Sequence, residues 1–179
     1  METLKALEGR KSWRSYTPKD VEQEKLEKVV AFANKAPNAG EFQVTVVRDK
    51  KLLQKINDET LLAMKNSGNS FLVSRASIEG YQPLYGANVF VVFSAAKSGY
   101  YQVNTATAAT AVTIAATDFG LASCFIITPT LILDGKDELS KQLNLKEGFV
   151  PVCGVVLGYG EEKNNFSRER AIPQNINYV

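Results

Sequence analysis

Two groups of basic residues are the part of this sequence best suited to chemistry. The first is the stretch RKSWR at positions 10–14, and the second is the pair Arg168 and Arg170. Guanidinium groups offer forked N–H donors that match phosphate oxygens, and a serine hydroxyl adds a further donor. If the fold brings the two groups together, they form a site for one terminal phosphate. If it does not, they are solvated surface charges, and their spacing alone leaves both interpretations open.

The residue types that are missing narrow the chemistry further. Histidine is absent from the 179 residues, which excludes Ser/His/Asp and Cys/His hydrolases. Neither GxGxxG nor GxxxxGK[ST] occurs, so a dinucleotide-binding Rossmann site and a P-loop are not expected. No Cys or carboxylate cluster has the spacing of metal ligands, and we expect no metal. Chemistry in this chain would therefore come from an organic cofactor.

Composition and charge indicate a cytoplasmic protein that binds neither nucleic acid nor membrane. Twenty-one Lys and Arg against nineteen Asp and Glu give a net charge of +2, so the long-range field is weak. The longest apolar runs have the length of strands, and residues 1–10 lack an apolar signal core. Cys124 and Cys153 both lie among apolar residues, which favours buried thiols over a disulfide.

Hydrophobic periodicity predicts helices and strands along the chain. The expected helices cover 2–8, 18–35, 50–68, 100–120 and 134–144, and the expected strands cover 44–49, 88–95, 121–127 and 150–160. Thr17 and Pro18 suit the N-cap and first position of the second helix, and the tail after 160 is expected to run extended. The order predicts one domain over 1–179, of α/β or α+β class, with helices covering a mixed sheet.

The segment 100–120 is built almost wholly from Ala, Thr, Val and Ile. Its length and the closing Gly120 favour a helix, and small side chains on every face allow close approach of neighbouring elements. It is either a central helix or a dimer contact.

Five segments, in order, resemble motifs of the FMN-dependent nitroreductase family. GRKSWRSYTP is similar to RRSxRxF, NKAPNAGEFQ to APSxxNxQPW, and PLYGANVFVVFSA to YGAPxxIVV. ATDFGLASCFI is similar to LGLGSCWI, and VPVCGVVLGYG, followed by a basic pair, is similar to PVAxxxLGYP. The likeness covers nearly the whole chain, from segment 9–18 to the C-terminal arginines.

The resemblance implies an α+β fold, with a mixed sheet flanked by helices, that forms an intertwined homodimer with one FMN at each of two interfaces. It implies that Arg10 and Ser12 hold the FMN phosphate, that Lys11 contacts the flavin chain, and that Arg14 reaches the pyrimidine edge. The other implied contacts come from the C-terminal basic pair, from a segment supplied by the partner subunit and from a strand end along the ring; these residues are Arg168, Arg170, Pro37, Asn38, Ala39, Glu41, Gln43, Ile126, Ile127 and Thr128.

The resemblance also implies a reaction. NADH or NADPH would deliver hydride to flavin N5 and leave, after which a nitroaromatic, a quinone or a flavin would accept it in a ping-pong cycle. Arg14 would be the catalytic side chain through its charge at the flavin edge, and a side-chain base is not required. A related flavin enzyme that catalyses another reaction, such as dehalogenation or enone reduction, is a further hypothesis.

An alternative is a non-catalytic FMN-binding protein that stores, senses or delivers the cofactor. Glu41 stands where the family usually has asparagine, and Val44 and Thr45 replace its Pro-Trp pair. A carboxylate near the flavin would be costly if it were buried without a partner.

Overall fold

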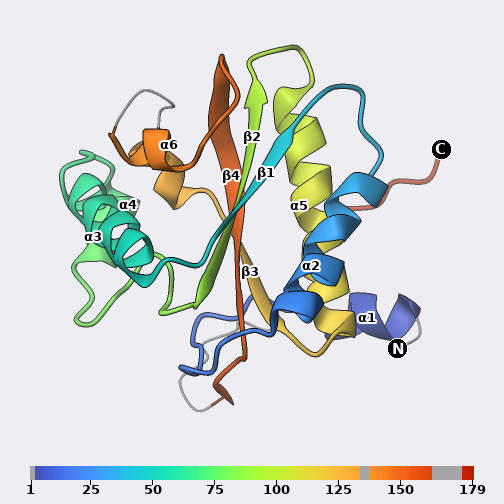
Figure 1. Ribbon diagram of the computed structural model, residues 1–179, viewed down its shortest axis with the longest axis horizontal. Helices are drawn as coiled ribbons and strands as arrows, with labels where there is room; N and C mark the ends of the chain where they lie inside the picture. The colour runs from blue at the N-terminus through green and yellow to red at the C-terminus, as the bar shows by residue number, and fades with distance from the viewer. Residues whose placement is uncertain (1–2, 134–137, 163–174) are drawn as a thin grey trace.

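A four-stranded sheet forms the middle of the structure, a computed structural model that describes residues 3–133, 138–162 and 175–179 (Figure 1). Its strands are β1 (Gln43–Val47), β2 (Val89–Ala96), β3 (Ala122–Ile126) and β4 (Phe149–Gly158), in the order β1-β2-β4-β3. All pairings between these strands are antiparallel. Within the described ranges, the parallel component of the expected mixed sheet is a single bridge between Ser12 and Ser123. The α+β class is confirmed.

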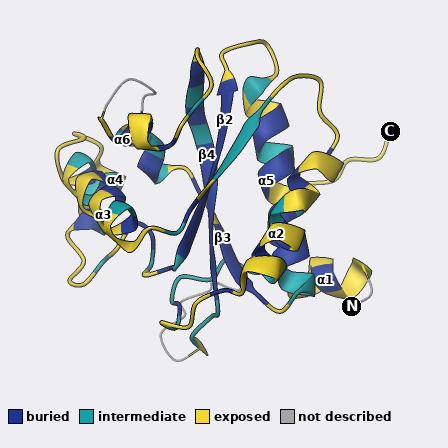
Figure 2. Cartoon of the chain, in the orientation of Figure 1, coloured by how far each residue is buried: buried dark blue, intermediate teal, exposed yellow. Residues whose placement is uncertain are grey.

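Helices cover both faces of this sheet (Figure 1). One side carries α1 (Thr3–Gly9), α2 (Gln23–Ala31), the 3-10 turn η1 (Phe32–Lys35) and α5 (Tyr101–Asp118). The other side carries α3 (Lys50–Lys65), α4 (Ser70–Ala76) and α6 (Glu138–Gln142), and the 3-10 turn η2 (Thr128–Leu131) follows β3. The sheet is therefore buried between two helical layers, and Figure 2 shows β2 and most of β4 as buried, whereas the edge strand β1 is mostly intermediate.

Two hydrophobic clusters, one on each face of the sheet, form the core. Successive strand residues point to opposite faces, so the apolar run of β2 serves both clusters. Val91 and Phe93 pack on the α5 side, while Phe90 and Val92 pack on the α3 side. Burying one such side chain contributes about 1.5–3 kcal/mol, which makes β2 a principal source of stability.

The Ala- and Thr-rich segment forms α5, a central helix packed against the sheet. Ala108, Ala109 and Val112 are fully buried on its inner side. The buried hydroxyl of Thr105 donates to Tyr101 O at 2.8 Å, so a threonine can lie in the core without an unpaired donor. The segment is therefore a helix buried at the centre of the fold.

Three local differences from the sequence prediction are informative. The second helix begins after Glu22 instead of Thr17, because residues 11–17 pair with the sheet. Helix α4 was not expected; the Asn69 side chain caps it by accepting from the backbone N of Phe71 and Leu72. Most of the expected extended tail, 163–174, and the start of the 134–144 helix, 134–137, lie outside the described residues. The described end of the tail, 175–179, has no regular secondary structure.

Candidate functional site

The basic segment 10–17 lies along the free side of β3 and continues beside the end of β4. Trp13 N donates to Ser123 O at 2.9 Å, which places the segment next to the edge strand β3. Further along, Thr17 N donates to Tyr159 O at 2.8 Å. These backbone bonds fix the direction of the side chains at positions 10, 12 and 14.

Two aromatic residues anchor the same segment. Tyr16 is buried, and its ring packs against Gly158, while the half-buried ring of Trp13 packs against Gly160. A Cβ at either glycine would come within 3 Å of these rings, at 2.9 Å for Gly158 and 2.4 Å for Gly160. Burial raises the pKa of Tyr16 well above its usual value, so the phenol stays neutral. Both aromatic residues therefore act as packing anchors.

Three arginines lie near enough to the buried thiol of Cys124 on β3 to act on its charge. Burial raises the pKa of Cys124, and the nearby positive charges of Arg14, Arg10 and Arg75 act in the opposite direction. The Ser12 side chain hydrogen bonds to the same thiol. Arg10, Ser12 and Arg14 therefore all act on the same thiol of β3.

Arg75, on α4, was missed by the sequence reasoning. It lies between two aromatic rings, with its Cζ 5.1 Å from the ring centre of Tyr81 and 6.0 Å from that of Phe71. One feature of the sequence could have drawn attention to it: Arg75 is the only arginine between positions 49 and 167. Arg75 and Arg14 act on the same thiol through tertiary packing, which spacing in the sequence does not show.

Lys11 points toward the end of β4. Its Nζ lies 3.1 Å from the Glu162 carboxylate and 4.2 Å from the centre of the Trp13 ring. The two side chains of this ion pair are 38% and 72% exposed, so the pair contributes little and Lys11 can exchange partners.

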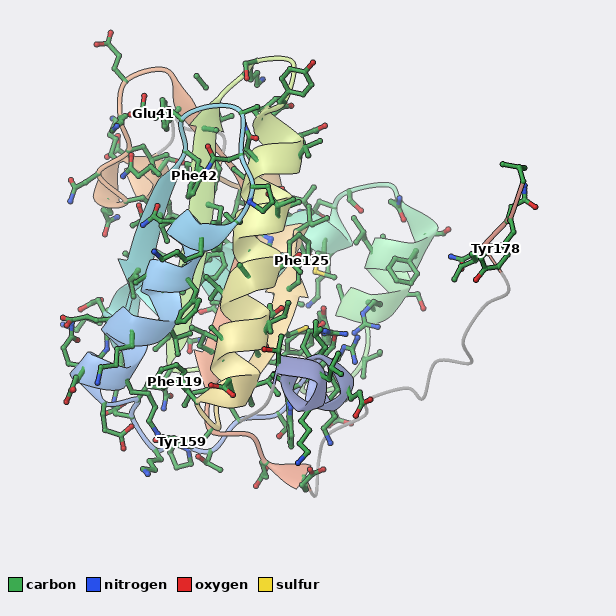
Figure 3. The ribbon with its side chains drawn as sticks, turned by 90° about the vertical axis from the view of Figure 1, so that its right-hand side faces the viewer. Glu41, Phe42, Phe119, Phe125, Tyr159 and Tyr178 are labelled. Atoms are coloured by element: carbon green, nitrogen blue, oxygen red, sulfur yellow. The ribbon has the colours of Figure 1, made fainter. Side chains whose placement is uncertain are left out.

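Segment 37–43 lies at the opposite end of α5 from the basic segment (Figure 1). Two side chains of α5 hold it: Asn104 Oδ1 accepts from Ala39 N at 2.9 Å, and Thr107 Oγ1 donates to Pro37 O at 3.1 Å. Figure 3 shows Glu41 and Tyr159 at opposite ends of the molecule. Within one chain, the segment containing Asn38 therefore does not meet the arginines.

Glu41 and Gln43 contact the loop that leads into β4. Within one chain Glu41 is exposed, and its carboxylate pairs with Lys146. The Gln43 side chain donates to Asn144 O at 2.9 Å and accepts from Lys146 N at 2.8 Å. These contacts give both residues a structural task within the chain.

The end of β3 presents an apolar strip beside the arginines. Ile126 is buried, Thr128 is half-buried, and Ile127 is 58% exposed. Phe125 is partly exposed beside α5 (Figure 3). An anionic group would meet guanidinium groups at one end of this edge, and a flat apolar group would meet Phe125 and Ile127 along it. Arg168 and Arg170 lie outside the described residues.

The described ranges contain neither a metal-binding cluster nor a membrane-spanning helix. They contain no group of three or more His, Cys, Asp or Glu side chains that could hold a metal ion. No helix in them has both the length and the apolar character needed to cross a membrane.

The sheet between two helical layers, with arginines gathered at one edge, defines an α+β protein whose edge is suited to an anion. A family model described as the nitroreductase family matches residues 7–159. The chain therefore belongs to the nitroreductase family. A comparison with curated protein sequences gave no match.

Several solved structures share this fold over the whole of this chain and nearly the whole of their own. A nitroreductase with bound FMN from Desulfitobacterium hafniense DCB-2 is 26% identical, with a TM-score of 0.87, and the match covers 100% of this chain and 99% of that one. A nitroreductase with bound FMN from Bacteroides fragilis NCTC 9343 is 23% identical, with a TM-score of 0.84 and the same coverage. A BluB-like flavoprotein from Clostridium difficile 630 is 18% identical, with a TM-score of 0.76 and the same coverage.

Proposed function

We propose that this protein is an FMN-dependent NAD(P)H oxidoreductase whose electron acceptors are nitroaromatics, quinones or flavins. The observation that carries the proposal is the convergence of Arg10, Arg14 and Arg75 on the edge strand β3, in a chain of the nitroreductase family. An anionic ligand would offset the repulsion between these like charges, and FMN is anionic.

The residues at this edge fit FMN in two respects. Arg10 and Ser12 offer donors for the phosphate, with Lys11 nearby, and the half-buried Arg14 would meet the pyrimidine edge. Phe125 and Ile127 offer apolar surface along the strand for the flat ring. We assign Arg75 to the flavin edge together with Arg14. Bound FMN would supply the hydride chemistry, which the chain's own side chains lack.

The chain's own contribution is binding and electrostatics. Reduced flavin tends to carry negative charge near its pyrimidine ring, and a fixed guanidinium at Arg14 favours that charge in a partly desolvated site. Hydride transfer needs no side-chain base, which agrees with a sequence that contains no histidine. The phosphate contacts contribute affinity, and the edge contacts tune the potential.

We further infer an intertwined homodimer in which the partner supplies segment 37–43, including Pro37 and Asn38. The separation of this segment from the arginines of its own chain supports this inference. Exposed apolar side chains also support it: Val103 on α5 is 60% exposed, and Tyr178 near the C-terminus is 89% exposed and stands away from the body (Figure 3). The roles of Arg168 and Arg170 over the phosphate remain part of the proposal.

The test is an anaerobic titration of the flavin-loaded protein with NADH and, separately, with NADPH. We expect the visible flavin bands to bleach with at least one nicotinamide and to return when menadione or a nitroaromatic is added. Flavin bands that persist with both nicotinamides would overturn the enzyme proposal and support the alternative, a non-catalytic FMN-binding protein. Within a single chain Glu41 is exposed and pairs with Lys146, so a carboxylate that the partner brings to the flavin would arrive with a cation beside it.

A further inference from the structure

The turn that precedes β2 holds a tyrosine in an unfavourable backbone conformation. Tyr85 has a φ of 56°, in the left-handed region that side chains with a Cβ rarely adopt. Its backbone N donates to Gln82 O at 2.9 Å, and Leu84 N donates at 3.2 Å to Oδ1 of Asn57, a buried residue of α3. The turn is thus tied to the helix beneath it. Strain that the surroundings maintain points to a constraint on this side chain.

The Tyr85 ring contacts the Tyr81 ring, and the Tyr81 ring contacts Arg75. The rings of Tyr81 and Tyr85 meet edge to face, with centres 6.0 Å apart and an interplanar angle of 82°. The Arg75 Cζ lies 5.1 Å from the centre of the Tyr81 ring, and both phenols hydrogen bond to the guanidinium. Burial raises the pKa of Tyr85 to about 12, so its phenol stays neutral. The two tyrosines therefore offer Arg75 oxygen atoms and a ring face.

Arg75 needs hydrogen-bonding partners because a second positive charge, Arg14, also lies near Cys124. It shares the surroundings of Cys124 with Arg14, and two like charges there repel each other. Without acceptors, the long Arg75 side chain would turn toward solvent, where its charge is hydrated. The phenol oxygens and the Tyr81 ring offset this tendency.

We propose that Tyr85, acting with Tyr81, is a positioning residue that holds Arg75 beside Arg14, so that two guanidinium groups face the same end of the FMN site. The proposal rests on the proposed function and deepens it. It assigns control of FMN affinity and of the flavin potential to a tyrosine pair that precedes β2.

The test is a double-mutant cycle with Tyr85→Phe and Arg75→Gln. Tyr85→Phe keeps the ring and the backbone conformation and removes only the hydroxyl. We expect it to raise the FMN dissociation constant about fivefold, the size of one lost hydrogen bond, and to make the flavin potential more negative. In the Arg75→Gln background, the same change should alter the dissociation constant by less than about twofold. Equal effects in both backgrounds, or no effect in the native background, would overturn the proposal.

Tyr100→Phe is the matched control, because Tyr100 is an exposed tyrosine at the start of α5. It should leave affinity and potential unchanged. A second readout uses the flavin-free protein: the Arg75 Nε–H signal in a nitrogen-15 NMR spectrum should be protected from exchange, and Tyr85→Phe should remove that protection. A native protein that binds no FMN would refute the proposed function, whereas FMN binding without coupling, or an unprotected Arg75, refutes only the tyrosine assignment.

Discussion

The indole ring of Trp13 lies directly on the backbone of Gly160, where an added Cβ would come 2.4 Å from the ring. This contact joins the basic segment to the residue that follows β4 by two positions. It also gives a physical reason for a glycine in the LGYG motif, since a side chain at 160 would push the indole away from the strand.

Gly160→Ala should therefore disturb the site as well as the fold. Overpacking of this kind costs about 1–3 kcal/mol of unfolding free energy, which urea denaturation would measure. FMN affinity should also fall, because Trp13 fixes the direction of Arg14. Gly99→Ala is the control, because no atom lies within 4 Å of a Cβ at that position. Unchanged stability in the Gly160 variant would contradict the packing seen here.

Arg10→Ala should weaken FMN binding by about 1.5–3 kcal/mol, the range of a hydrogen bond to a charged group. Fluorescence titration of the flavin-free protein measures this change. Arg48→Ala serves as the control: Arg48 donates to Gln23 Oε1 and Val21 O, next to β1 at the other edge of the sheet. An equal loss of affinity in the two variants would show that Arg10 has no specific role.

Arg14→Gln should make the potential of the bound flavin more negative, because a positive charge beside the reduced ring is lost. Each 1.4 kcal/mol of lost stabilisation of the two-electron reduced form corresponds to roughly 30 mV. Arg14→Lys retains the charge and should shift the potential less. Spectroelectrochemical titration of the three proteins separates these cases, and identical potentials would rule out the electrostatic role.

The stability of the protein should depend on Glu22 in acid. A hydrogen bond from Tyr159, at 2.5 Å, lowers the pKa of Glu22 to about 2, and Lys19 and Lys25 lower it further. A lowered pKa means that the contribution is complete above the unfolded value of about 4.3 and is lost as the pH falls toward 2. Glu22→Gln should flatten the urea midpoint over this window. Glu27→Gln should keep the native profile, and a native profile in Glu22→Gln would contradict the assignment.

Much of the fold follows from local patterns in the sequence. The apolar runs of β2 and β4 and the periodic face of α3 predicted these elements within a few residues, because burial of their side chains dominates their stability. The start of α2 was wrong because a cap signal at Thr17 is local, whereas the pairing of Thr17 with Tyr159 is made across the fold. Helix α4 has seven residues and an exposed Phe71, too little for a periodic signal.

The sequence predicted only those residues of the candidate site that lie within a recognisable motif. The segment 10–14 carries its own signature of arginines and serine, and Arg10, Ser12 and Arg14 all act on the same thiol of β3. Arg75 carries no such signature, since Tyr81 and the packing of α4 place it. Glu41 has a partner within the chain, Lys146, which is 105 positions away and could not be foreseen from spacing in the sequence.

The proposed flavin site is tested most directly by titrating the flavin-free protein with FMN and following flavin fluorescence, with absorbance measured after gel filtration. We expect saturable quenching at one FMN per chain, yellow protein, and a marked loss of affinity when Arg10, Arg14 and Arg75 are replaced together by glutamine. Quenching that does not saturate, or FMN binding that the triple replacement leaves intact, would contradict the assignment of this edge as the flavin site.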